Sequence, residues 1–270
     1  MNVKITSAVP IIAITLVVAF MRPGQATEAA IEKMPVNLET RFALSAVPPV
    51  MRDKATVYLL DPKNGYQLSR QGSSGVTCLV ERTVWEWAEL RSDIYIPLCY
   101  DAAGTKAHLK VIMDTASLRA QGMGAVALKA EIEKRYKNGT YKAPEKAGLS
   151  YMVAPVMRAL GPPDMKMHTM SMPHLMFYAP NLTNEDIGAV PDLSVHDSLL
   201  YPFIDRQGID EQSYMIQLVG AAERAKIMAD ETTLPQRPLR LSRRTLPSEA
   251  REALTSPQDP DRLKSLPRPD

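Results

Sequence analysis

The sequence predicts an α+β fold, with one domain built on an antiparallel sheet, two to three helices and a disordered C-terminal tail. Three observations carry this prediction. Runs of β-branched and aromatic residues between turns come first, a helical periodicity of apolar residues follows, and further strand patterns come after it. Strands, then helices, then strands are typical of segregated elements rather than of the regular alternation that builds a parallel sheet.

Four strands are predicted in the first part of the domain. Residues 56–60, 66–70 and 76–81 are rich in β-branched and aromatic side chains, with Asp-Pro-Lys-Asn-Gly and Gly-Ser-Ser-Gly turns between them. Asn-Gly is a strong turn dipeptide, so these three segments predict an antiparallel meander. A fourth strand at 94–100 is expected to close back on the third.

Two helices are predicted next. A short one runs to Arg119, with Asp114 or Thr115 as its cap and Gly122 as its stop. The second covers 125–136, where apolar residues at every fourth position form one face. That face consists of Leu128, Ile132 and Tyr136. The remaining predicted elements are strands at 149–153, 174–179 and 213–219 and a last helix at 221–228.

Residues 1–26 have the pattern of a secretory signal peptide. Lys4 supplies a basic start, residues 9–20 form an uncharged apolar run, and Gly-Gln-Ala follows as a cleavage site. Arg22 ends the apolar run before it reaches the roughly 20 residues that a membrane-spanning helix needs. We therefore expect cleavage, no stable membrane anchor afterwards, and an exported bacterial protein, periplasmic or secreted.

The chain has two cysteines, Cys78 and Cys99. An even pair in an exported protein is typically one disulfide bond. A loop of this size would stabilise the fold by about 3 kcal/mol in the chain-entropy model. A nucleophilic or metal-binding role is not favoured, because Cys-x-x-Cys is absent and both residues lie in apolar, strand-like sequence.

The predicted boundaries divide the mature chain into three parts. A loosely ordered segment covers 27–44, a single α+β domain covers 45–228, and a Pro/Arg-rich tail covers 229–270. The tail mixes both charge signs with recurring prolines, so it cannot bury enough apolar surface to offset its ordering entropy. A solvated tail is favoured over an arm that binds a protein partner, and both interpretations stay open.

The charge balance excludes one class of partner. The formal net charge is +2. The expected signal peptide contains Lys4 and Arg22 and no acidic residue, so its removal leaves the mature chain without net charge. Nucleic-acid binders usually show a basic excess, so no nucleic acid is expected as a partner. Electrostatic binding to a membrane surface is disfavoured for the same reason.

The most unusual stretch is the Met-rich segment, residues 165–176, in which five methionines and two histidines fall within twelve residues. In an extended strand, alternate side chains point to one side. Those on one side would be His168, Met170, Met172, His174 and Met176, of which the first four are the candidate metal ligands. Thioethers and imidazoles are ligands that Cu(I) favours, so copper is the metal cofactor that this pattern suggests.

Geometry favours other interpretations of the Met-rich segment. Side chains on one face of a strand lie about 6.5–7 Å apart, too far for one ion to take three of them unless the backbone curls. Methionine is also a common gap filler at adaptable apolar surfaces. Apolar packing is therefore the favoured interpretation, followed by the wall of a small-ligand site and then by a copper site.

Residues 173–188 form an apolar strand that runs into a turn rich in polar side chains. Asparagine and aspartate in such turns often cap backbone groups, and this role is favoured over binding. If the turn does bind a ligand, the candidate residues are His174, Tyr178, Asn181, Asn184 and Asp186.

Several motifs resemble one group of proteins. They are HLMFYAPNLTNEDIG, GVTCLVER, LCYDAAG, YPFIDRQG and SYMIQLVG. Together they resemble a group of uncharacterised exported bacterial proteins that share an FYAP-x-LTN-x-DIG block. The resemblance covers about residues 45–220. It implies a single exported domain, and it implies no activity, cofactor or catalytic residue.

The sequence does not decide whether the chain is an enzyme. The leading interpretation is an exported protein that binds a small ligand through the Met-rich segment and the turn after it. One alternative is an envelope copper-binding protein that uses residues 165–176. A second is a hydrolase with a His/carboxylate site, although Gly-x-Ser-x-Gly is absent. Its candidate residues are His174 or His196 with Asp186 or Asp197.

Overall fold

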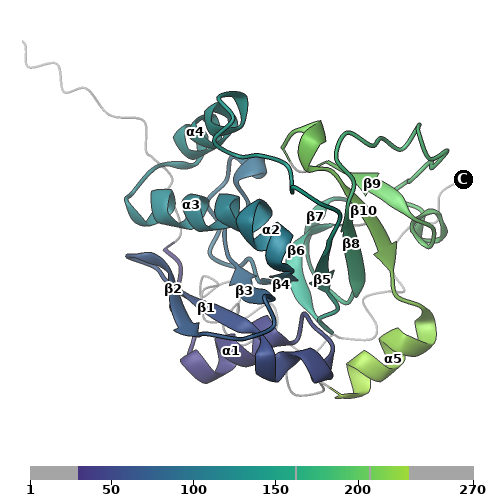
Figure 1. Ribbon diagram of the computed structural model, residues 1–270, viewed down its shortest axis with the longest axis horizontal. Helices are drawn as coiled ribbons and strands as arrows, with labels where there is room; N and C mark the ends of the chain where they lie inside the picture. Colours follow the sequence, from purple (N-terminus) through teal and green to yellow (C-terminus); the bar gives the residue numbers. More distant parts are fainter. Residues whose placement is uncertain (1–29, 162, 207, 231–270) are drawn as a thin grey trace, which may run out of the picture.

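The computed structural model describes residues 30–230, except 162 and 207. The expected signal peptide and nearly all of the expected tail lie outside the described residues. Within them the fold is α+β, as predicted: a mostly antiparallel eight-stranded sheet, a separate two-stranded sheet and five α-helices (Figure 1). None of the described helices is long and apolar enough to cross a membrane.

The eight-stranded sheet contains every strand that the sequence predicts and one more, β9. Its order is β2-β1-β3-β4-β5-β8-β10-β9, antiparallel except where β1 meets β3. The strands are β1 Thr56–Asp61, β2 Gly65–Arg70, β3 Thr77–Glu81, β4 Ile96–Tyr100, β5 Leu149–Met152, β8 His174–Tyr178, β9 Phe203–Asp205 and β10 Tyr214–Leu218.

The predicted antiparallel pairing of the second and third strands is wrong. β3 lies on the side of β1 away from β2, and it runs parallel to β1. The connection that makes this possible passes close to the start of β1, where a Cβ on Gly72 would lie 2.3 Å from the carbonyl oxygen of Lys54. Only glycine, which has no Cβ, allows the two backbones to come this close. The Gly-Ser-Ser-Gly turn had suggested a simple hairpin between the second and third strands.

The described helices are α1 Val36–Leu44, α2 Ala102–Lys106, α3 His108–Ala120, α4 Ala125–Lys137 and α5 Ala221–Asp230. The prediction for α4 is confirmed, including its buried face of Leu128, Ile132 and Tyr136. The predicted start of the short helix, at Asp114 or Thr115, is wrong, because α3 already begins at His108. Helical structure begins at α2, because the side chain of Asp101 accepts hydrogen bonds from the first free backbone N–H groups.

The predicted N-terminal boundary is also wrong. α1 lies within the segment expected to be loosely ordered, yet Leu38 and Phe42 are buried in a core shared with β1, β3 and β4. Glu39 is buried as well and accepts a 2.7 Å hydrogen bond from the N–H of Leu60. Two apolar residues four positions apart are too short a pattern to identify a helix, which tertiary packing stabilises here.

The predicted disulfide is present and lies inside the core. Cys78 on β3 and Cys99 on β4 are directly opposite each other and are bonded. Both residues are fully buried beneath α1. On the other face of the sheet, α3 packs on a core that includes residues of β3, β4, β8 and β10. The sheet therefore separates two apolar layers.

A hairpin that the sequence did not predict carries the first half of the Met-rich segment. It consists of β6 Met157–Gly161 and β7 Lys166–Met170, which form the two-stranded sheet. Two backbone hydrogen bonds between Tyr95 and Arg158, of 3.0 and 2.8 Å, attach it beside β4. The hairpin thus projects from the main sheet at a fixed point.

Candidate functional site

The Met-rich segment lines a pocket between the hairpin, the end of β10 and the start of α5. The segment is not one continuous strand, because residues 171–173 lead from β7 in the small sheet to β8 in the large one. This bend brings Met170 and Met172 to the same cavity, of about 230 Å³, which we call the Met pocket. Its other apolar residues are Pro173, Leu199, Leu200, Leu218, Val219 and Ala221.

Two polar side chains complete the lining of the Met pocket, Ser171 and Arg224. The hydroxyl of Ser171 donates to the sulfur of Met228, at 3.1 Å, which ties α5 to the Met-rich segment. Arg224 lies in the first turn of α5 and forms no ion pair within the described part of the chain. A single unpaired guanidinium beside apolar walls can attract an anionic group.

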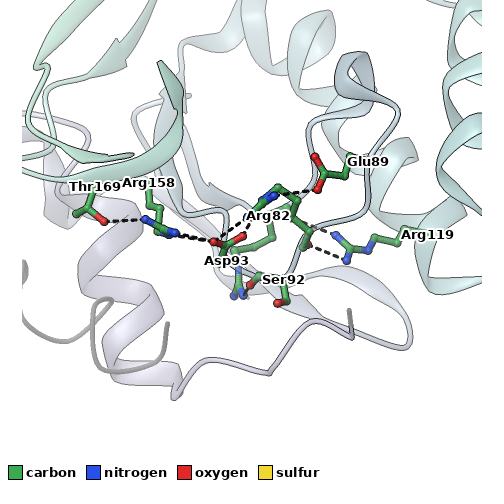
Figure 2. Close-up of polar contacts among 8 residues, drawn as sticks. Arg82, Glu89, Ser92, Asp93, Arg119, Arg158 and Thr169 are labelled. Carbon is green, nitrogen blue, oxygen red and sulfur yellow. Dashed lines mark hydrogen bonds and ion pairs between the residues drawn. The ribbon is translucent and has the colours of Figure 1, made fainter. Parts of the chain in front are cut away.

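A polar network fixes the hairpin that supplies Met170 (Figure 2). Arg158 on β6 donates to one carboxylate oxygen of Asp93 at 2.7 and 3.2 Å, and to the hydroxyl of Thr169 on β7 at 3.4 Å. Arg91 donates to both oxygens of Asp93, at 2.9 and 3.2 Å. Burial opposes ionisation of Asp93, but hydrogen bonds from the two arginines lower its pKa overall.

The same network holds the loop between β3 and β4 by its backbone. Arg82 is buried, lies 4.4 Å above the ring of Tyr95 and donates to the carbonyl oxygen of Ser92 at 3.0 Å. Arg119 of α3 donates to the carbonyl oxygens of Arg82 and Arg91, at 3.2 and 2.8 Å (Figure 2). Asp93 is therefore presented to the hairpin by a loop that is itself tightly bound.

The two histidines proposed as copper ligands lie outside the lining of the Met pocket. Nε2 of His168 is 2.6 Å from a carboxylate oxygen of Asp164, and this hydrogen bond lowers the pKa of Asp164 to about 2. His174 is buried, with Nδ1 2.6 Å from the carbonyl oxygen of Met172. Residues 30–230 contain no group of three or more His, Cys, Asp or Glu side chains that could hold a metal ion.

The polar turn after β8 makes contacts with backbone groups. The amide of Asn184 bonds to both the N–H and the carbonyl oxygen of Ile204, at 2.7 and 3.0 Å, and so fixes β9. Asp186 accepts from the N–H and hydroxyl of Thr183, at 2.8 and 2.7 Å. Asn181 takes the left-handed conformation, with φ of 62°. None of these three side chains lines the Met pocket.

A buried cluster around His108 carried no signal in the sequence. The His108 ring packs between Tyr178 and Tyr214, with centroid distances of 4.9 and 4.5 Å. Burial lowers the pKa of His108 to about 4, and its Nε2 has no hydrogen-bond partner among the described atoms. The hydroxyl of Tyr178 donates to Asp101 at 2.9 Å. Tyr178, a predicted ligand residue, thus belongs to the core.

Two carboxylates with shifted pKa values lie near the end of β3. Burial raises the pKa of Glu86, which lies in the short 3-10 helix η2 Trp85–Trp87, to about 7. Burial also raises the pKa of Glu81, and the charge of Glu86 adds to that effect. Acidic groups of this kind can take part in proton transfer. Neither residue lines the Met pocket, so they are separate from the site described here.

The residues suggested for a hydrolase show no His/carboxylate hydrogen bond among the described contacts of His174 and Asp186. His174 contacts the carbonyl of Met172, whereas Asp186 contacts Thr183. His196 and Asp197 lie in the 3-10 helix η3 His196–Leu199. Comparison with models of known protein families, with curated proteins and with solved structures finds no match to this chain. The site must therefore be interpreted from its own geometry.

Proposed function

We propose that this chain is an exported protein that binds a small molecule with an apolar body and an anionic head in the Met pocket. The export part of the proposal is supported by the N-terminal sequence pattern and by the disulfide. The binding part is supported by one observation: an apolar cavity of about 230 Å³ has in its wall a cation, Arg224, that forms no ion pair with any described residue.

The chemistry of the lining explains the ligand class. Methionine side chains are flexible and polarizable, so Met170 and Met172 can adapt to an alkyl chain or a ring. Small-molecule sites are typically apolar with a few polar groups that fix orientation. Arg224 would take the head group, while the Asp93–Arg158 contact keeps the hairpin wall in place before the ligand arrives. Such preorganisation reduces the entropy lost on binding.

The test uses octanoate as the probe, titrated into the disulfide-bonded protein and followed by calorimetry. Octanol and acetate serve as comparisons, because octanol lacks the charge and acetate lacks the apolar body. We expect octanoate to bind more tightly than either one. Equal affinity for octanoate and acetate, or no saturable binding of octanoate, would contradict the proposal.

Two variants separate the head group from the apolar body. Arg224→Gln is expected to weaken octanoate binding about tenfold, the effect of losing one charge-assisted hydrogen bond, and to leave octanol binding unchanged. Arg206→Gln is the matched control, since Arg206 is exposed, pairs with Asp210 and lies outside the pocket lining. An equal loss in both variants would show a general charge effect instead of a site.

Copper remains a second candidate, because Met170 and Met172 bring two thioethers to one cavity. Elemental analysis of gently purified protein tests it. Stoichiometric copper that is lost in Met170→Leu/Met172→Leu would support a Cu(I) site. A metal-free protein that also fails to take up added Cu(I) would remove this candidate, and the octanoate experiment would be unaffected.

A further inference from the structure

A second cavity, of about 320 Å³, lies away from the Met pocket, where α2 and the start of α3 face residues 140–146. We call it the lysine pocket. Part of its lining consists of alanines of α2 and the α2–α3 junction, Ala102, Ala103 and Ala107. Four lysines line it as well, two from each side: Lys106, Lys110, Lys142 and Lys146. Glu145 is the only acidic residue in the lining.

Positive charge in the lysine pocket is largely uncompensated. Lys106, Lys142 and Lys146 form no ion pair within the described part of the chain. Their side chains are exposed, and the Debye length at physiological salt is about 8 Å, so they repel one another appreciably only where they lie close together. Their mutual repulsion would be relieved by a bound anion.

The fourth lysine, Lys110, has a partner that it shares. Its ammonium group donates to a carboxylate oxygen of Asp114 at 2.7 Å, and the same oxygen accepts from Arg135 at 2.9 Å and from the Tyr141 hydroxyl at 3.0 Å. Arg135 has a second partner, Glu131, whose carboxylate oxygen lies 2.9 Å from its Nε. The charge of Lys110 is therefore compensated, and the uncompensated charge of the pocket comes from the other three lysines.

The walls of the lysine pocket are fixed through the backbone. Gln212 is fully buried, and its amide donates to the carbonyl oxygen of Lys142 at 2.8 Å. Tyr141, beside it, is buried and bonded to Asp114. At the end of the connection between α4 and β5, the N–H of Leu149 donates to the carboxylate of Asp101, the cap of α2, at 2.9 Å. The two sides of the cavity are therefore held in register without a ligand.

We infer that the lysine pocket binds a small multivalent phosphate, either a free molecule or a phosphate head group of a lipid. Lysine ammonium groups are compact point charges that bind phosphate oxygens from several directions, without the planar geometry that arginine imposes. The cavity has room for a compact group, and small alanine side chains let that group approach the helix backbone closely. This inference is independent of the Met pocket.

The experiment is a calorimetric titration of inorganic pyrophosphate into the full mature chain in about 150 mM NaCl, where weak surface attraction is screened. We expect saturable binding. The variant Lys142→Gln/Lys146→Gln should raise the dissociation constant about tenfold or more, since two ammonium contacts are lost. Both side chains are exposed, so the variant should unfold at the same temperature as the wild type.

The matched control is Lys134→Gln/Lys137→Gln. It removes the same charge from exposed positions on α4, outside the pocket lining. Its affinity for pyrophosphate should stay within about twofold of the wild type, because distant charges are screened at this salt concentration. No saturable binding, or an equal loss in both double variants, overturns the inference. Octanoate binding should be unchanged in both, which separates failure here from failure of the Met-pocket proposal.

Vesicles distinguish the two sources of phosphate. Flotation is carried out with phosphatidylcholine vesicles that contain phosphatidic acid and with phosphatidylcholine vesicles alone. Capture only by the phosphatidic acid vesicles, lost in Lys142→Gln/Lys146→Gln, assigns the pocket to a lipid head group. Pyrophosphate binding without capture assigns it to a free phosphate. Capture that persists in this variant counts against the lysine pocket as the site.

Discussion

His108 shows how a single buried residue can set the response of this protein to pH. In the unfolded state the imidazole has a pKa near 6.5. In the folded state, burial among Tyr100, Tyr178 and Tyr214 lowers this pKa to about 4. Between these values the unfolded state binds the extra proton. The contribution of His108 to the free energy of unfolding is therefore fully present above pH 6.5 and is lost as the pH drops towards 4.

We predict that His108→Phe removes this part of the pH dependence. The contribution of His108 should amount to a loss of about 2 kcal/mol on going from about pH 7 to about pH 5. Glu86 acts in the opposite direction in this range, since its pKa is raised to about 7, but it is present in both proteins and cancels in the comparison. Urea unfolding of wild type and variant at the two pH values tests this. An unchanged slope in His108→Phe would contradict it.

The residues of the proposed site were only partly recognisable from the sequence. Met170 and Met172 stood out by composition, so a role in a ligand wall could be suggested for them. Arg224, Leu199 and Leu218 lie in other segments that meet the Met-rich segment only in the folded chain. Nothing in their local patterns indicates this. The charges of the lysine pocket were hidden in the same way, because the chain as a whole is nearly balanced.

At the scale of elements, the β6–β7 hairpin is joined to the rest of the molecule mainly through its own first strand. Besides the backbone bonds of Tyr95, the side chain of Arg158 is the described polar link, and Asp93 is its acceptor. The Asp93 and Arg158 side chains are only 16% and 20% exposed, so their ion pair is little screened by solvent. Asp93 should therefore control how firmly the hairpin is held.

We predict that Asp93→Ala lowers the free energy of unfolding by about 1.5 to 3 kcal/mol, because hydrogen bonds to two partly buried arginines are lost. Octanoate binding should weaken as well, since Met170 lies at the end of the loosened hairpin. Asp164→Ala is the control on the same hairpin, where an exposed pair with His168 is removed. Chemical unfolding and calorimetry give both quantities. An effect of Asp93→Ala no larger than that of the control would refute this role.

Helices and strands were predicted correctly where the apolar pattern in the sequence was long. The prediction failed where contacts with distant residues determine the secondary structure. In α4, Leu128, Ile132 and Tyr136 repeat over three turns, which is enough to define a face. The hairpin strands are rich in methionine and contain one β-branched residue, Thr169, so they give little strand signal. α1 has only a short apolar repeat and depends on its contacts with the sheet.

At the scale of the whole molecule, the disulfide restricts the unfolded chain more than it shapes the native one. Cys78 and Cys99 are already neighbours through strand pairing, and the bond closes a loop with a sequence separation of 21. In the unfolded state the same bond removes many extended conformations. Its contribution should therefore appear in the free energy of unfolding and not in the pairing of β3 with β4.

We predict that Cys78→Ala/Cys99→Ala keeps its secondary structure but loses about 3 kcal/mol of stability. Far-ultraviolet circular dichroism checks the first part and urea unfolding checks the second. Wild type under oxidising conditions is the reference. A variant as stable as the wild type, or one that no longer folds at all, would show that the bond plays a different role.

The fold class could be predicted because it depends only on the order of strand and helix patterns along the chain. The strand order could not, since it depends on which distant segments meet. The parallel pairing of β1 with β3 rests on a close approach at Gly72, a contact that no periodicity records. Pairings of β5 with both β4 and β8 likewise join segments far apart in sequence.

The strand order also determines when folding can finish. The N-terminal part of the sheet, β2-β1-β3-β4, can pair as soon as residue 100 is available, but β4 must wait for β5, and β8 must wait for β10. Long-range pairing of this kind is slow, and a growing chain cannot complete it before its last strands exist. Under the proposed export this delay would be useful, because an incompletely paired chain can still pass through a translocation channel and the sheet closes only once its C-terminal strands have arrived.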